Sequence, residues 1–308
     1  MKRELLFVLP SPFRDEFRIQ GFRFGSGEKS IAIVGAMRGD ELQQQFVCSQ
    51  LVSTLHDLEE RGHIAAGHEI LVIPSANPFA MNIGKRFWAM DNTDINRMFP
   101  GYSLGETTQR IAAALFEQLQ GYRFGVQMSS YYLSGSYIPH VRMMRTGYEN
   151  TELAQGFGLP YTLLRTPRPF DTTTLNYNWQ IWETQAFSIC AGNSHVIDID
   201  GARDTVSAVL RFMSLHGIIH CRTHPGYYSE VLEEESLITV KARRAGILYC
   251  LCKPDDIVRR DQVLARILDP YDGSVRWDVR APEDGTVFFI HDDALALENS
   301  MLFRIIPS

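Results

Sequence analysis

Residues 30–41 read SIAIVGAMRGDE, an apolar run that passes through glycines into a group of charged side chains. The run at 30–34 is rich in β-branched residues and ends at Gly35, a pattern typical of a strand buried on both faces. Residues 41–58 then place apolar side chains at helical spacing, with glutamines on the other face. This stretch predicts a buried strand, a tight turn and a helix. The apolar positions of that helix are Leu42, Phe46, Leu51 and Leu55.

The same alternation continues along the chain. Residues 69–74 predict a second buried strand and 107–119 an amphipathic helix, and a strand at 196–199 and a helix at 202–216 follow. Strands that alternate with helices through short links are typical of an α/β fold with a mainly parallel sheet flanked by helices. We expect this domain to span residues 1–226.

The period changes after about residue 227. Short alternating apolar runs, separated by turn residues such as Asp272-Gly273, replace the helical patterns. The remainder, residues 227–308, predicts a second, all-β domain. Its runs cover residues 237–241, 263–268, 285–290 and 301–306.

Composition excludes several classes of protein. The 308 residues are 45% hydrophobic and 21% charged, with a formal charge of −6, which excludes wholesale disorder and disfavours a nucleic-acid partner. No apolar run approaches the ~18 residues of a membrane span. Five cysteines, of which only Cys250 and Cys252 lie close together, disfavour a disulfide framework. The basic start at Met1 leads into only a short apolar stretch, so we expect a cytoplasmic protein.

Candidate functional residues follow the predicted strands, where α/β sheets bind their ligands. Four segments have this position. They cover residues 35–41, 77–101, 126–130 and 188–192.

The segment around Arg86 and residues 94–101, DINRMFPG, resembles the succinylglutamate desuccinylase and aspartoacylase family of zinc carboxypeptidase-like hydrolases. The resemblance covers nearly the whole chain and implies a zinc-carboxypeptidase-like sheet. It also implies a lipoyl-like barrel sandwich at the C-terminus, although no lysine stands at a hairpin tip for modification. Further matching segments are residues 156–160, 173–175, 245–246, 256–258 and 281–287.

The resemblance also implies a zinc-dependent amide hydrolase. In the family two histidines and a glutamate hold the zinc, and a second glutamate activates the water. The first motif, Gly-x-x-His-Gly-x-Glu, falls on residues 35–41, where Glu41 is kept and Arg38 replaces the histidine. The other histidine position falls on Met128 and the general base on Cys190. The family's catalytic positions are therefore mostly substituted.

These substitutions alter the expected chemistry. Arginine stays protonated and has no lone pair for a metal, and a thioether is a poor zinc ligand. We therefore expect no zinc cofactor and a catalytically altered member of the family. Our hypothesis is that Arg38 pairs with Glu41, so that a guanidinium occupies part of the space of the metal.

The substrate-binding motif, in contrast, is kept. By resemblance Asn96 and Arg97 hold a carboxylate of an acyl-amino-acid-like ligand, with Arg86 on the same wall and Arg142 nearby. Because arginine pairs with carboxylates through two hydrogen bonds, these residues predict a small carboxylate-bearing partner. The alternatives are a structural ion pair between Arg97 and Asp94, and a solvated Arg86.

Other readings of the chemistry remain open. An active amidohydrolase cleaving an N-acyl amino acid would need Cys190 as nucleophile, with His140 or His195 as base, or a relocated metal. A metal site could combine Asp40, Glu41, His140 and His195. A soft copper site is a further alternative to a methionine-rich core, and its residues would be Met37, Met128, Met143, Met144 and Cys190.

A third class of function is a scaffold that binds another protein. Trp88, Tyr131 and Tyr132 are candidates for exposed interface residues, and an edge at 285–290 would permit a homo-oligomer. The acidic run at residues 233–235 predicts a solvated turn.

Overall fold

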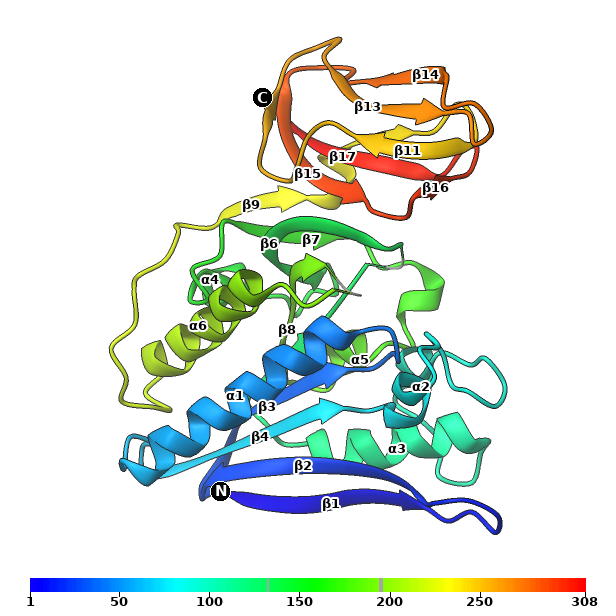
Figure 1. Cartoon of the computed structure of the whole chain (residues 1–308). Coiled ribbons are helices and arrows are strands. Elements are labelled where there is room, and N and C mark those ends of the chain that lie inside the picture. The colour runs from blue at the N-terminus through cyan, green and yellow to red at the C-terminus, as the bar shows by residue number, and fades with distance from the viewer. Residues whose placement is uncertain (132, 194–195) are drawn as a thin grey trace.

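The computed structural model describes residues 1–131, 133–193 and 196–308 (Figure 1). Tyr132 and His195, two of the candidates above, lie outside the described residues. Among the described residues, one sheet contains 13 strands and a second sheet contains 4. Ten strands of the large sheet lie in the order β1-β2-β4-β3-β5-β8-β6-β15-β17-β10, and β7, β9 and β12 pair off this path.

The centre of the large sheet consists of parallel strands. β3 (Gly27–Ala36) pairs with β4 (Gly67–Ser75) on one side and with β5 (Phe124–Met128) on the other, and β5 pairs with β8 (Gln185–Asn193). The predicted strands at 30–34 and 69–74 are therefore confirmed within longer strands. Alternate residues of β3 enter two hydrophobic clusters, Ile31 and Ile33 in one and Ala32 and Val34 in the other.

The large sheet is mixed, so the expectation of a mainly parallel sheet is corrected. β1 (Lys2–Leu9) and β2 (Phe17–Gly25) form an antiparallel hairpin beside β4. β6 (Gly135–Met144) runs antiparallel to β8 but parallel to β7 (Tyr161–Arg165). Hairpins need only short turns, which lets antiparallel strands extend a parallel centre.

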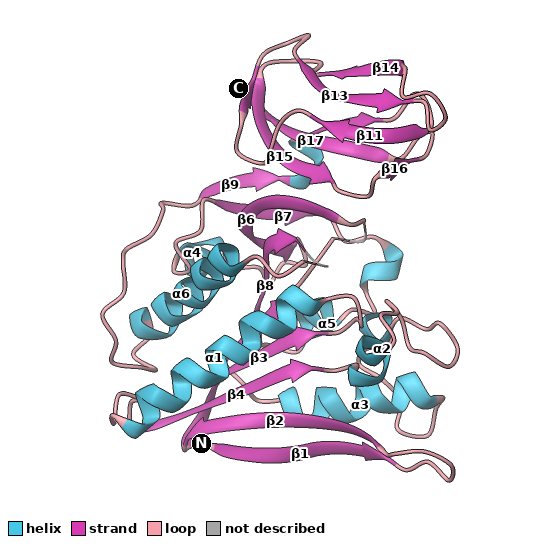
Figure 2. Ribbon diagram, in the orientation of Figure 1, coloured by secondary structure: helices cyan, strands magenta, loops and turns pink. Residues whose placement is uncertain are grey.

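The helices cover this sheet (Figure 2). α3 (Thr107–Leu119) has the predicted bounds, and α1 (Leu42–Glu60) begins and ends close to them. Leu42 is 46% exposed, and α1 instead buries Val47 and Cys48 beside Leu51 and Leu55. The shorter helices are α2 (Pro78–Asn82), α4 (Thr151–Gln155) and α5 (Leu175–Ile181), with 3-10 turns at η1 (Ile95–Arg97), η2 (Pro169–Asp171) and η3 (Glu234–Ser236).

The predicted strand at 196–199 is wrong. Val196 and Ile197 are exposed in a loop, and Ile199 opens α6 (Ile199–Leu215). The strand of this part of the chain is β8, whose apolar residues lie earlier. The short apolar run at 196–199 predicted a buried strand, but its apolar side chains are exposed in the folded protein.

The C-terminal residues form an antiparallel unit that is joined to the large sheet. β15 (Gly285–His291) pairs with β6, and β17 (Met301–Pro307) pairs with β15 and β10 (Ile238–Lys241). β9 (Glu230–Glu233) pairs with β7. The domain boundary at 226/227 and the barrel-sandwich class stay predictions. The remaining strands are β11 (Gly246–Cys250), β12 (Ile257–Val258), β13 (Val263–Leu268), β14 (Val275–Arg280) and β16 (Leu295–Ala296).

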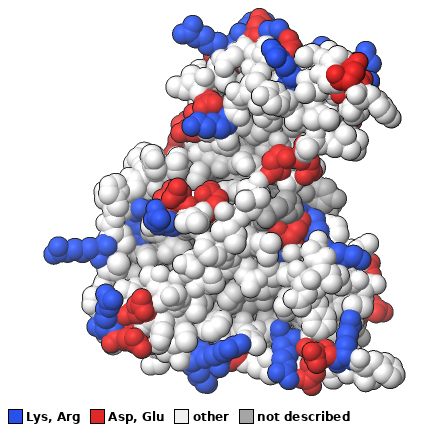
Figure 3. All heavy atoms as spheres, in the orientation of Figure 1, with Lys and Arg blue, Asp and Glu red and all other residues white. Residues whose placement is uncertain are grey.

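Basic and acidic side chains are interspersed over the face shown in Figure 3, without a broad field of one sign. Among the described residues, no helix combines the length and the apolar character that a membrane crossing requires.

Candidate functional site

A cavity of about 670 Å³ lies where the α/β part of the chain meets the C-terminal strands. Its wall combines residues of β5 to β8 with residues of β10, η3 and β17. We call it the arginine cavity, because six arginines line it. They are Arg38, Arg97, Arg142, Arg165, Arg168 and Arg304.

The floor of the arginine cavity follows from strand register. Gln127 of β5 lies opposite Ser188 of β8, which lies opposite Arg142 of β6, and all three line the cavity. Successive side chains of a strand face opposite sides of a sheet. The neighbouring residues Met128 and Ile189 accordingly belong to a buried hydrophobic cluster. Met128, which the resemblance places at the family's second histidine position, is therefore a core residue here.

Glu41, at the start of α1, is 1% exposed and accepts hydrogen bonds on both carboxylate oxygens. Its Oε2 accepts from the backbone N–H groups of Met37 (2.9 Å) and Arg38 (3.1 Å). Its Oε1 accepts from Arg38 Nη1 (3.1 Å) and from the Ser130 hydroxyl (2.6 Å). A carboxylate offers about four lone-pair sites, so these four donors fill it.

Arg38 lies between two carboxylates. Its Nη1 donates to Glu41, while Nε and Nη2 donate to Oδ2 of Asp94 at 3.2 and 2.9 Å. Burial opposes the charge of this guanidinium, but Glu41 and Asp94 outweigh burial and raise the pKa of Arg38. The expected pairing of Arg38 with Glu41 is present, and Asp94 adds a second partner.

The described residues do not fit a zinc ion. The lone pairs of Glu41 already accept four donors, a cation stands at the first histidine position, and Met128 is in the core. Within residues 1–131, 133–193 and 196–308, no three His, Cys, Asp or Glu side chains are grouped as metal ligands.

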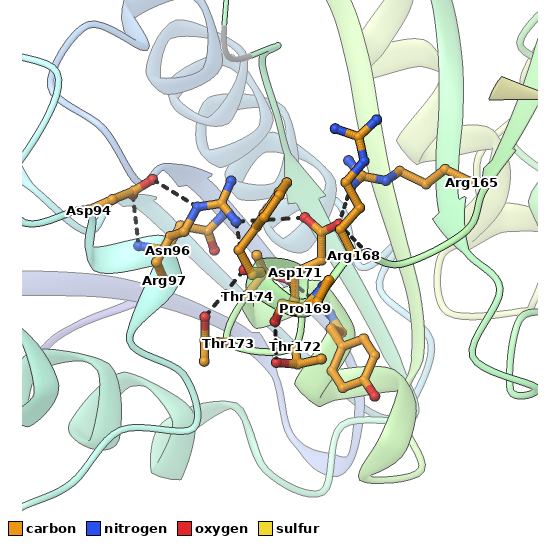
Figure 4. Close-up of polar contacts among 12 residues, drawn as sticks. Asp94, Asn96, Arg97, Arg165, Arg168, Pro169, Asp171, Thr172, Thr173 and Thr174 are labelled. Carbon is orange, nitrogen blue, oxygen red and sulfur yellow. Dashed lines mark hydrogen bonds and ion pairs between the residues drawn. The ribbon is translucent and has the colours of Figure 1, made fainter. Parts of the chain in front are cut away.

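The kept motif Asp94–Arg97 serves the architecture of the cavity wall (Figure 4). Asp94 Oδ1 accepts from the Asn96 N–H at 3.1 Å, and Asn96 Oδ1 accepts from the N–H of Leu175 at 3.2 Å. Arg97 Nη1 donates to the carbonyl of Phe170 at 2.6 Å, and its guanidinium lies 4.6 Å from that ring. Arg97 and Asp94 also form the alternative ion pair, at 3.8 Å.

Asp171, 2% exposed, organises the turn that Arg97 contacts. Its Oδ2 accepts from Arg165 Nη2 and from the Arg168 N–H, the latter at 2.9 Å. The exposed side chain of Arg168 rises beside Arg165 in Figure 4 and contacts the Phe170 ring, but forms no ion pair with the described carboxylates. Sequence reasoning missed Arg165, the last residue of β7, and Arg168, which precedes η2, because neither carries a periodic or motif signal.

Glu234 lies inside the arginine cavity, so the expectation of a solvated turn at 233–235 is wrong for this residue. Its Oε1 accepts from Arg304 Nη1 at 2.9 Å. Its Oε2 lies 3.5 Å from Arg142 Nε and 3.8 Å from Arg165 Nε. Burial opposes its ionisation, but these arginines outweigh burial and lower the pKa of Glu234.

Arg86 does not line the cavity. Its Nη1 donates to Asp40 at 2.7 Å and its Nη2 to the carbonyl of Tyr131 at 3.1 Å, so it is neither solvated nor on the predicted wall. Trp88 and Tyr131, expected as exposed interface candidates, are buried at 1% and 7%. Both pack into hydrophobic clusters, which corrects that expectation.

Cys190 and His140 lie opposite each other on β8 and β6, and both are fully buried. Burial raises the pKa of the Cys190 thiol to about 12 and lowers the pKa of His140 to about 4. His140 Nδ1 lies 2.7 Å from the carbonyl of Ile138. At neutral pH this thiol is protonated, which is unfavourable for a nucleophile.

Comparison with known proteins identifies the family. Residues 27–216, more than half of the chain, match the model of the succinylglutamate desuccinylase/aspartoacylase catalytic domain. No curated protein sequence matches the chain.

Solved structures with the same fold include three bacterial proteins. A succinylglutamate desuccinylase from Silicibacter sp. is 17% identical, with a TM-score of 0.82 over 99% of this chain and 94% of that one. A succinylglutamate desuccinylase/aspartoacylase from Rhodobacter sphaeroides is 18% identical, with a TM-score of 0.80 over 98% and 95%. A product-bound ectoine utilization protein from Ruegeria pomeroyi is 17% identical, with a TM-score of 0.80 over 100% and 95%. With the match across residues 27–216, the chain belongs to the succinylglutamate desuccinylase/aspartoacylase family.

Proposed function

We propose that this protein is a catalytically altered member of its family that binds a small, carboxylate-bearing, acyl-amino-acid-like ligand in the arginine cavity without zinc. The observation that carries the proposal is the Arg38–Glu41 pair. In it a guanidinium and a carboxylate neutralise each other at the family's metal-binding motif. Amide hydrolysis by a zinc-bound water has no support from these donors.

The remainder of the cavity supports anion binding. Arg142 contacts Glu234 only at ion-pair distance, and its guanidinium lies 5.0 Å from the Tyr131 ring, beside Ser188 and Gln127 on the floor. Arg168 forms no ion pair within the described residues. Guanidinium groups without a hydrogen-bonded acid are strong partners for a ligand carboxylate.

Asn96 and Arg97 act differently in this proposal from what the family motif implies. Arg97 is already engaged by the Phe170 carbonyl and Asn96 Oδ1 by the backbone of Leu175. They shape the wall and hold the η2 turn, while Arg142 and Arg168 contact the ligand. Arg86, paired with Asp40, supports the loop behind the wall.

Two measurements on untagged protein purified without chelator test the proposal. The first is zinc content by mass spectrometry after incubation with excess zinc and desalting; we expect far less than one zinc per chain. The second is calorimetric titration with N-acetyl-L-asparagine, with N-acetyl-L-alaninamide as the ligand without a carboxylate. We expect only the carboxylate to bind, and no acetate to be released.

Matched variants localise the binding. Arg142→Gln removes a cavity arginine and is expected to weaken binding roughly tenfold or more. Arg145→Gln, three residues away and paired with Glu233 at the surface, is expected to leave it unchanged. One zinc per chain with acetate release that depends on zinc would overturn the proposal. Equal binding of the amide would also overturn it.

A further inference from the structure

Glu234 lies where arginines from three strands converge. Arg142 comes from β6, Arg165 from β7 and Arg304 from β17, and all three lie within 4 Å of the Glu234 carboxylate. Glu234 itself stands in η3, between β9 and β10. The chain has therefore placed one of its own carboxylates in an arginine cluster that would otherwise accept an anion.

The hydrogen bonds of this cluster are incomplete. Arg304 donates to Glu234 Oε1, but Oε2 is buried and accepts no hydrogen bond within the described part of the chain. Arg304 Nε is likewise buried without an acceptor there. Three guanidinium groups offer far more donors than one carboxylate accepts. The three arginines therefore have the composition of an anion-binding site, and the Glu234 carboxylate, which belongs to the chain itself, occupies that site without satisfying all of its hydrogen-bond donors.

The balance of arginines and carboxylates around the cavity indicates how many carboxylates a ligand can bring. The six cavity arginines face five carboxylates that line the cavity or hydrogen-bond Arg38, which leaves one net positive charge. Without Glu234 the excess would be two. The five carboxylates are Glu41, Asp94, Asp171, Glu234 and Glu235.

Uncharged side chains also line the arginine cavity. Leu133 and Met301 line the cavity and pack against the same hydrophobic cluster. Thr239 of β10 lies opposite Arg304 in the sheet and lines the cavity as well. A neutral acyl or side-chain end of a ligand would find both apolar and hydroxyl contacts there.

We propose that Glu234 is a specificity-determining residue of the arginine cavity. Its carboxylate occupies the position beside Arg142 Nε, Arg165 and Arg304 that a second ligand carboxylate would take, so the cavity selects a monocarboxylate whose other end is uncharged. This inference rests on the proposed function and narrows its ligand class. A dicarboxylate would face Glu234 across a short distance, and like charges repel there.

The test uses two ligands of nearly equal shape, N-acetyl-L-asparagine with one carboxylate and N-acetyl-L-aspartate with two. Calorimetry gives the ratio of their Kd values for the wild type and for Glu234→Gln. We expect the wild type to prefer the monocarboxylate, and the variant to shift the ratio toward the dicarboxylate by roughly tenfold. Glu233→Gln is the matched control, because Glu233 pairs with Arg145 outside the cavity. It should keep the wild-type ratio.

A second readout does not depend on these ligands. Sodium sulfate is expected to raise the Tm of Glu234→Gln more than that of Glu233→Gln, relative to sodium chloride at equal ionic strength. An unchanged ratio, a wild-type preference for the dicarboxylate or equal sulfate responses would overturn the role of Glu234. Failure of the wild type to bind either N-acetyl compound would instead overturn the proposed function, and the sulfate response would still decide whether Glu234 fills an anion site.

Discussion

Arg38 Nη1 donates to Glu41 Oε1 across 3.1 Å, and the two residues are 7% and 1% exposed. Removing one member of a buried ion pair leaves the other charged and desolvated, which costs about 3–5 kcal/mol. Because Asp94 remains a second partner of Arg38, we expect Glu41→Gln to lower the free energy of unfolding by less than that, about 1–3 kcal/mol, in urea denaturation.

An exposed pair with the same sequence spacing serves as the control. Asp200 and Arg203 lie 3.0 Å apart with side chains 87% and 70% exposed, so Asp200→Asn should cost below about 1 kcal/mol. Equal stability of Glu41→Gln and wild type would show that the Arg38–Glu41 pair does not hold this part of the fold.

His140 is expected to make the folded protein sensitive to mild acid. Burial lowers its pKa from 6.5 to about 4. Between these two pH values the imidazole is therefore protonated in the unfolded chain but neutral in the folded protein. The stability from this residue is complete above pH 6.5 and is lost progressively as the pH falls toward 4. From pH 7 to 5 the loss is about 2 kcal/mol.

His140→Gln should remove that part of the pH dependence. The measurement is urea denaturation of wild type and variant at pH 7 and at pH 5. We expect the difference between the two pH values to be smaller for the variant. Identical pH dependence of the two proteins would mean that His140 protonates in the folded state as easily as in the unfolded state.

The Cys190 thiol should resist alkylation. Its pKa of about 12 leaves very little thiolate at pH 8, so iodoacetamide should modify it roughly a thousandfold more slowly in the folded protein than in urea. Peptide mass spectrometry gives both rates. Cys190→Ala should retain binding of N-acetyl-L-asparagine. Rapid labelling in the folded state would revive the nucleophile hypothesis.

Sequence predicted the elements whose burial is periodic. The strand at 30–34 lies between two hydrophobic clusters, and α3 buries one regular face, so each carries its own signal. The N-terminal hairpin of β1 and β2 was not predicted, since much of β1 is only partly buried and its pattern is weak. The run at 196–199 failed for the opposite reason, because apolar residues there are exposed.

The residues of the arginine cavity could be predicted from the sequence only where they belong to a recognisable motif. Arg38 and Glu41 lie three positions apart, so their pairing follows from local spacing. Glu234 reaches Arg142 and Arg304 across long stretches of chain, through the pairing of β6, β15 and β17. Such contacts depend on strand order, which a single sequence does not give. Arg86 shows the converse, since its motif position is kept while its side chain turns to Asp40.

Arg165 and Arg168 offer a final contrast, because they lie on one stretch of chain and line the same cavity but differ in partners. Arg165 bonds to the buried Asp171, whereas Arg168 forms no ion pair within the described residues. Arg165→Ala should therefore destabilise the fold by about 1–3 kcal/mol, because the buried Asp171 loses its side-chain hydrogen bond but keeps the Arg168 N–H and an ion pair with Arg97 at 3.7 Å.

Arg168→Ala should leave the free energy of unfolding within about 0.5 kcal/mol of wild type, because the residue is exposed and no buried acid loses its partner. It should weaken binding of N-acetyl-L-asparagine roughly tenfold, with Arg168→Lys between the two because the charge remains while the two-pronged geometry is lost. Calorimetry and urea denaturation on the same preparations separate the two effects. If Arg168→Ala bound the ligand as tightly as wild type, the ligand carboxylate would have to sit at Arg142 alone, on the sheet floor rather than at the η2 turn.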